Sequence, residues 1–187
     1  MLLAEHYGSM IVIFLRLLIP FSILRWPIAG AILSIIFDTV DVVILSVLGH
    51  GSFYTGNYTR VDNALDTFFL LLLLIVAFKW KDPLAKYTCI ALFTWRVIGV
   101  IMVEFTDVRE LLFVFPNLFV LFYLFWALRN RFFPHFVLTW KRLLIILIVL
   151  LIPKLLQEYA LHVAKLQPWT WIKSEFLSKL LKINLPA

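Results

Sequence analysis

Residues 68–78 read Phe-Phe-Leu-Leu-Leu-Leu-Leu-Ile-Val-Ala-Phe, an unbroken apolar stretch that ends at Lys79. Together with the residues before it, this stretch forms a run from about Val61 to Phe78. Its length is close to the roughly 20 residues that a helix needs to cross a bilayer. The run is continuously apolar, whereas the strands of a membrane barrel alternate apolar and polar residues. It therefore predicts a transmembrane helix.

Similar apolar runs lie on both sides of this segment. They are separated by polar residues or by proline and glycine, which favour turns. The chain therefore predicts an all-α fold, a polytopic membrane helix bundle with six transmembrane helices in residues 1–165. The other five spans are expected at about 7–24, 27–48, 87–105, 111–128 and 143–163, the last one kinked at Pro153.

The composition excludes a water-soluble domain. Of 187 residues, 63% are hydrophobic and 15% are charged, and a soluble fold could not cover so much apolar surface. The net charge of +6 comes from basic residues at the ends of the apolar runs, where they meet lipid headgroups and set topology. We therefore expect membrane lipids as partners, no nucleic acid, and a homo- or hetero-oligomer as an open alternative. Cys89 is the only cysteine, which excludes an intrachain disulfide.

The last residues, 166–187, have a different pattern. Apolar side chains recur at helical spacing, and lysines occupy the opposite face. This pattern predicts an amphipathic helix that lies in the membrane interface. The apolar residues are Trp169, Ile172, Phe176, Leu180 and Ile183, and the lysines are Lys173, Lys179 and Lys182.

Four aspartates are the main candidates for a functional site. Asp38 and Asp41 lie three apart near the end of the second span, and Asp62 and Asp66 lie four apart at the start of the third. These spacings place each pair on one helix face. Because consecutive spans are usually neighbours, the four carboxylates are expected at one depth of the membrane. Six spans would place nearly all of the acids in the half of the bundle nearer the termini.

Carboxylates inside a membrane are costly and repel one another when they are unpaired. A divalent cation such as Mg²⁺ or Mn²⁺ would relieve both penalties through oxygen ligands. The alternative is that the aspartates pair with Arg16, Arg60 or Arg96, or lie at the wet interface. These three arginines are also the candidates for substrate binding, since a deep arginine needs either a carboxylate or a bound phosphate. Arg96 and Glu104 lie eight residues apart on the fourth span, so they share a helix face, and we expect both to face the bundle interior because a charge that faces lipid is costly.

The sixth span carries a second polar stripe, Lys154, Glu158 and His162, spaced four apart. One interpretation is that these side chains bind a substrate or exchange a proton with it. The other is that they form an ion pair near the membrane interface. The ion pair is the preferred interpretation, because residues four apart on a helix are neighbours.

The aspartate pattern resembles that of the CDP-alcohol phosphatidyltransferases, which are small six-span enzymes. Asp38, Asp41, Asp62 and Asp66 match that family's signature in order, in the spacing within each pair and in placement, and residues 15–20 are similar to its first span. The resemblance covers roughly residues 10–70. It implies that the four aspartates bind a divalent metal and the CDP diphosphate, and that Asp66 deprotonates the attacking alcohol. The rest of the chain resembles bacterial membrane proteins, so the expected location is the bacterial inner (plasma) membrane.

The chain also departs from the family pattern. Val42 stands where the family has glycine, Tyr58 replaces a second glycine, and the family's Ala-Arg pair is absent. Two classes of function therefore stay open. One is a metal-dependent phospholipid-headgroup transferase. The other is a non-catalytic membrane protein, such as a small cation or solute carrier or an accessory subunit of a membrane complex.

Overall fold

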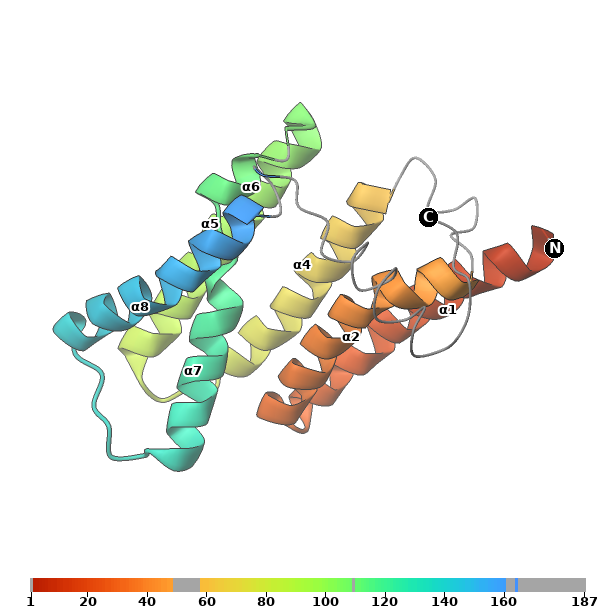
Figure 1. The fold of residues 1–187 in the computed structure, drawn as a ribbon. Helices are drawn as coiled ribbons and strands as arrows, with labels where there is room; N and C mark the ends of the chain where they lie inside the picture. The colour runs from red at the N-terminus through yellow and green to blue at the C-terminus, as the bar shows by residue number, and fades with distance from the viewer. Residues whose placement is uncertain (1, 49–57, 109, 161–163, 165–187) are drawn as a thin grey trace, which may run out of the picture.

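The fold is described from a computed structural model, which describes residues 2–48, 58–108, 110–160 and 164. Every element that it assigns in these ranges is helical, which confirms the all-α prediction (Figure 1). The expected interfacial helix at 166–187, most of the 49–61 loop and His162 lie outside the described residues. The elements are α1 (Leu2–Leu18), η1 (Ile19–Leu24), α2 (Pro27–Leu48), α4 (Tyr58–Ala77), α5 (Pro83–Thr106), α6 (Leu111–Val114), α7 (Leu118–Phe132) and α8 (Trp140–Glu158).

The first two helices form an antiparallel pair joined by a tight corner (Figure 1). Pro20 lies near the start of η1, where the chain changes from an α-helix to a tighter 3-10 helix. The carbonyl of Ser22 then accepts the amides of Arg25 and Trp26, at 3.1 and 2.8 Å. Gly30 lets α2 pass close to this corner, since a Cβ atom there would lie 2.5 Å from the amide nitrogen of Ile23.

Helix α5 begins four residues before the predicted start at Tyr87. The Asp82 side chain accepts a hydrogen bond from the amide of Ala85 at 3.0 Å, so Asp82 is the N-cap residue, and Pro83 occupies the first turn. This helix start was readable in the sequence as an aspartate followed by a proline. The helix ends at Thr106, and the next residue, Asp107, is the C-cap with a left-handed φ of 55°.

The fifth predicted span is not one continuous helix. The chain leaves helical geometry at Phe115–Asn117, which separates the four-residue α6 from α7. Pro116 explains the break, because proline has no amide hydrogen and cannot continue a helical ladder. Gly99 of α5 makes room for it, since a Cβ atom at Gly99 would lie 2.3 Å from the Cβ atom of Phe115.

The core lies mainly where α4, α5 and α7 meet. Leucines of α4 pack against Cys89 of α5 and against the aromatic residues of α7. Trp80, in the turn after α4, stacks on Tyr123 with ring centroids 5.4 Å apart and lies 6.1 Å from Trp126. The fully buried members of this cluster include Leu70, Leu73, Phe119, Phe122, Tyr123 and Trp126.

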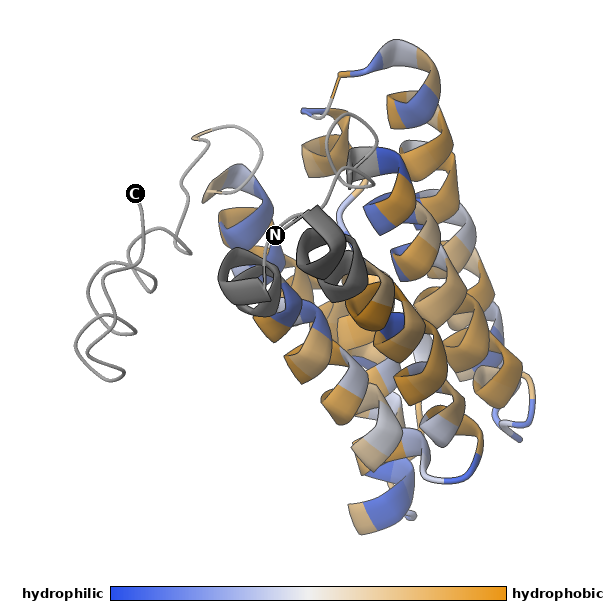
Figure 2. Ribbon diagram, turned by 90° about the vertical axis from the view of Figure 1, so that its right-hand side faces the viewer, coloured by the Kyte–Doolittle hydropathy of each residue, from blue (hydrophilic) through white to orange (hydrophobic). Residues whose placement is uncertain are grey.

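Two stretches of the described chain are long and apolar enough to cross a membrane, Pro83–Thr106 and Leu111–Phe132, the second of which joins α6 and α7. Only 22% of the apolar window in Pro83–Thr106 is buried, whereas a core helix of a soluble protein would be mostly buried. Hydrophobic residues make up most of the helices, as the colouring of the ribbon shows (Figure 2). The count of six spans stays a prediction. The other described helices do not meet this criterion of length and apolar character. Helix α4, for example, contains three charged residues, Arg60, Asp62 and Asp66.

Candidate functional site

A buried arginine, Arg16, lies at the centre of the candidate site. It belongs to the last turn of α1, just before Pro20 starts the 3-10 corner. Its side chain is only 5% exposed. A guanidinium at this depth carries a full charge and several N–H donors, so it needs acceptors within reach.

The predicted aspartates supply those acceptors from two other helices. On α2, Asp41 is buried, with its Oδ2 atom 3.0 Å from Nη1 of Arg16, and Asp38 contacts Nη2. On α4, Oδ1 of Asp62 lies 2.6 Å from Nη1, and Oδ1 of Asp66 lies 2.6 Å from Nη2. The guanidinium therefore joins three helices through four carboxylates, and the predicted convergence of the aspartates is observed. The alternative expectation, that the aspartates pair with an arginine, is confirmed for Arg16.

The four carboxylates differ in their exposure to the surroundings. The Asp41 side chain is 2% exposed, whereas those of Asp38, Asp62 and Asp66 are 48%, 32% and 33% exposed. One carboxylate oxygen from each of the three partly exposed residues lies within 4.8 Å of the others. Asp41 thus faces the packed interior beside Arg16, while the other three carboxylates form an accessible oxygen cluster.

The charge of the cluster is unbalanced. Among the described residues, Arg16 is the cation whose ion pairs with these carboxylates are seen, so the group of five side chains carries a net charge of −3 when all four carboxylates are ionised. At this separation like charges disfavour the ionised state of their neighbours. The cluster can therefore bind a cation, hold protons, or accept a proton from a hydroxyl group that reaches it.

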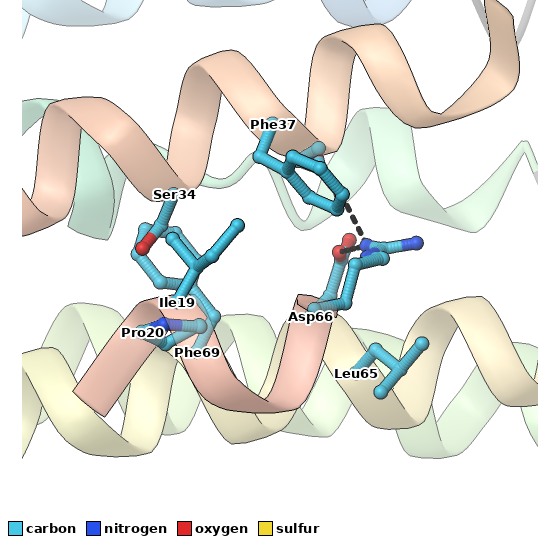
Figure 3. Close-up of a pocket in the computed structure, with 9 residues that line it drawn as sticks. Ile19, Pro20, Ser34, Phe37, Leu65, Asp66 and Phe69 are labelled. Carbon is cyan, nitrogen blue, oxygen red and sulfur yellow. Dashed lines mark hydrogen bonds and ion pairs between the residues drawn. The ribbon is translucent and has the colours of Figure 1, made fainter. Parts of the chain in front are cut away.

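A cavity of about 10 Å³ adjoins the cluster, room for a single water molecule or ion. Figure 3 shows Asp66 pointing toward the guanidinium at one end of the cavity, with Ser34 toward the other. The Ser34 hydroxyl donates to the carbonyl of Gly30 at 2.8 Å, which satisfies it within its own helix. The lining residues are Arg16, Ile19, Pro20, Ser34, Phe37, Asp38, Leu65, Asp66 and Phe69.

The other two arginines proposed for substrate binding have different surroundings. Arg60 is 61% exposed, and its Nε atom lies 2.7 Å from Oε1 of Glu104. Arg96 is buried, as expected, but its Nη1 atom donates to the backbone carbonyl of Phe115 at 2.9 Å. The expectation that Arg96 and Glu104 share an interior face is confirmed for Arg96, whereas the Glu104 side chain is 39% exposed.

A second buried polar group lies where α8 meets the break between α6 and α7. Nζ of Lys154 is 3.0 Å from Oε1 of Glu158, so the expected ion pair is confirmed for these two residues, whose side chains are largely buried. Oε1 of Glu158 also accepts the amide of Asn117 at 3.4 Å. The helix break explains both backbone contacts, because it frees the Phe115 carbonyl and the Asn117 amide from helical pairing.

Two residues near these groups escaped the sequence prediction. Asn63 is buried next to Asp62, and its Nδ2 atom has no acceptor among the described residues. The Phe115 carbonyl is a backbone group, so no side-chain pattern identifies it. Its one sequence signal is Pro116, because a proline inside an apolar run frees carbonyl groups nearby.

Comparisons of this chain with protein-family models, with curated proteins and with solved structures found no match.

Proposed function

We propose that this chain is a six-span membrane protein whose aspartate cluster binds a divalent cation and carries out a phospholipid-headgroup transfer like that of the CDP-alcohol phosphatidyltransferases. The observation that carries the proposal is the convergence of four carboxylates on Arg16, a group whose net charge is −3 when all four are ionised; the carboxylates are those of Asp38, Asp41, Asp62 and Asp66. Arg16 accounts for one positive charge in this group, and three of the carboxylates still offer oxygens within 4.8 Å of one another.

The exposed face of α8 supports the membrane placement. Six apolar residues of this helix recur at intervals of three or four, which places them on one face. Each of them is 58–68% exposed. A contiguous apolar face of this length is unusual on a soluble monomer and is the normal lipid-facing surface of a transmembrane helix. The set is Leu144, Ile145, Ile148, Val149, Ile152 and Leu156.

The donor set fits a hard divalent cation. Asp38, Asp62 and Asp66 offer carboxylate oxygens within 4.8 Å of one another, and Mg²⁺ and Mn²⁺ prefer oxygen ligands. Asp41 and Arg16 lie behind these oxygens, so the buried pair would hold α1 against α2 while the outer carboxylates bind. When bound, the cation would neutralise and polarise a diphosphate.

The chain's own residues would do the remaining chemistry. Asp66 lies one helical turn after Asp62 and lines the cavity, so its carboxylate is placed to accept the proton of an incoming hydroxyl group. Arg16 shares its two terminal nitrogens among four carboxylates. A nitrogen released from an aspartate when a cation binds would be available to a phosphate oxygen.

The alternative function is a non-catalytic one, as a small cation or solute carrier or an accessory subunit. A specific observation favours it, because a cavity of about 10 Å³ holds an ion but no nucleotide. Val42 and Tyr58, in place of the family's glycines, point the same way.

A turnover assay distinguishes the two functions. The purified protein is reconstituted into liposomes that contain CDP-diacylglycerol, and CMP release is measured with Mg²⁺ and a mixture of alcohol acceptors. The transferase predicts Mg²⁺-dependent release that Asp66→Asn lowers by about 100-fold or more, as for loss of a general base. Asp107→Asn is the control, because Asp107 is exposed and asparagine tolerates its left-handed backbone. If the protein binds Mg²⁺ but releases no CMP, the transferase function is wrong and the non-catalytic function is supported.

A further inference from the structure

An apolar cavity lies at the end of the bundle away from the aspartate cluster. Helix α4 begins beside the cluster and ends near Trp80, which packs on Trp126 of α7. The cavity lies beyond Trp126, between the last turns of α7 and the loop that leads to α8, and its volume is about 190 Å³. It is lined by Phe125, Leu128, Arg129, Phe133 and Phe136.

Two arginines hold the loop between α7 and α8 through hydrogen bonds to its backbone. The Arg129 guanidinium lies 4.7 Å from the ring centroid of Trp126 and donates to the carbonyl of Pro134 at 3.1 Å. The Arg142 guanidinium donates to the carbonyl of Val137 at 2.7 Å. Phe136 lies between them, with its ring centroid 5.9 Å from the Cζ atom of Arg129 and 5.1 Å from that of Arg142.

Neither arginine has a carboxylate partner in the part of the chain that the structure describes. The ion pairs among the described residues involve Arg16, Arg60 and Lys154, and none involves Arg129 or Arg142. The Nε atom of Arg129 is buried and has no acceptor within the described ranges. Arg129 also donates from Nη1 to Oδ1 of the neighbouring Asn130 at 2.8 Å. Within the described residues, the two guanidinium groups therefore contact backbone carbonyls, aromatic rings and one amide oxygen, but no anion. A guanidinium is best satisfied by a carboxylate or by a phosphate, which it can bind through two parallel hydrogen bonds.

We propose that this place binds an anionic glycerophospholipid of the bilayer, with a segment of an acyl chain in the apolar cavity and the phosphate on Arg129 and Arg142. The apolar cavity suits the acyl chain of such a lipid, and the two arginines suit its phosphate. The apolar lining excludes a free inorganic phosphate as a complete ligand, and the positive charges select an anionic lipid over a zwitterionic one. Basic side chains at the end of a transmembrane helix are where such headgroups lie.

The proposal requires the membrane placement, but it is independent of the aspartate cluster. Loss of cation binding or of turnover would leave the lipid site intact. Conversely, loss of the lipid site would leave the proposed transferase untouched, since the two sites lie at opposite ends of α4.

The test is native mass spectrometry of the full-length protein in detergent, titrated with phosphatidylglycerol and, separately, with phosphatidylcholine. We expect tighter binding of phosphatidylglycerol, and a loss of about fivefold in its affinity for each of Arg129→Gln and Arg142→Gln. Arg131→Gln is the matched control, because Arg131 is exposed on the same helix turn and does not line the cavity. It should leave the affinity unchanged.

Two further arms separate the parts of the site. Leu128→Trp fills the cavity without changing charge, and we expect it to weaken phosphatidylglycerol binding while the melting temperature is retained. Glycerol 3-phosphate, which has a headgroup but no acyl chain, should not displace the lipid. Equal binding of the two lipids, an equal loss in Arg131→Gln, or unchanged binding in Leu128→Trp would overturn the proposal. Should Arg129→Gln fail to fold, Arg142→Gln and Leu128→Trp decide the question.

Discussion

Replacing Arg16 by glutamine removes the charge that joins the four aspartates, and we expect it to destabilise the fold strongly. Arg16 and Asp41 have side chains that are 5% and 2% exposed, so their contact is a buried ion pair. Breaking such a pair from one side costs about 3–5 kcal/mol, because the remaining charge stays buried without compensation. The other three aspartates are 32–48% exposed, so each of their contacts with Arg16 contributes at most about 1 kcal/mol.

Arg60→Gln is the matched control. It removes the same charge, but Arg60 is 61% exposed and its pair with Glu104 is solvated. The cost of losing that pair is about 0–1 kcal/mol. Both variants lose one positive charge, so the difference between their free energies of unfolding reports the effect of burial at Arg16.

The assay is thermal unfolding of the detergent-solubilised protein, followed by the fluorescence of its seven tryptophans. A loss of about 4 kcal/mol corresponds to a melting temperature lower by about 10 °C for a chain of this size. Added Mg²⁺ should restore part of the loss in Arg16→Gln, since a bound ion stabilises the state that binds it. A melting temperature no lower than that of Arg60→Gln would refute the reasoning about the buried pair.

Three further predictions address packing, the helix break and topology. Gly99→Ala should cost about 1–3 kcal/mol in the same melts, because its Cβ atom would lie 2.3 Å from that of Phe115. Arg96→Leu should cost about 1–3 kcal/mol by leaving the Phe115 carbonyl without its donor, and unchanged stability would show that the contact is dispensable. Asp107→Cys and His135→Cys should label from opposite sides of the membrane, since α6 and α7 run between them as one span, and labelling from one side would contradict the six-span model.

The sequence predicted the helices well where apolar runs end at polar or proline signals. Pro27 starts α2, as predicted. Helix α8 begins at Trp140, three residues before the predicted start, and contains Pro153, at which the kink stays a prediction. The fifth span was expected to contain Pro116 and Asn117, and Leu111–Phe132 is indeed long and apolar enough to cross a membrane. The chain leaves helical geometry at Phe115–Asn117, where proline cannot continue the helical ladder.

The candidate site was partly predictable. Spacings of three and four placed Asp38 with Asp41 and Asp62 with Asp66, and the adjacency of consecutive helices brought the pairs together. Which arginine would meet them was not predictable, because Arg16, Arg60 and Arg96 all had suitable chemistry. The choice depends on the helix crossing that η1 and Gly30 create, and this is a property of tertiary packing.

The most direct test of the central claim is calorimetric titration of the purified protein with Mg²⁺ and Mn²⁺. The account predicts saturable binding by the wild-type chain, abolished in Asp66→Asn and Asp62→Asn and retained in Asp107→Asn. Saturable binding that is equal in all four proteins, or no binding by the wild-type chain, would contradict it.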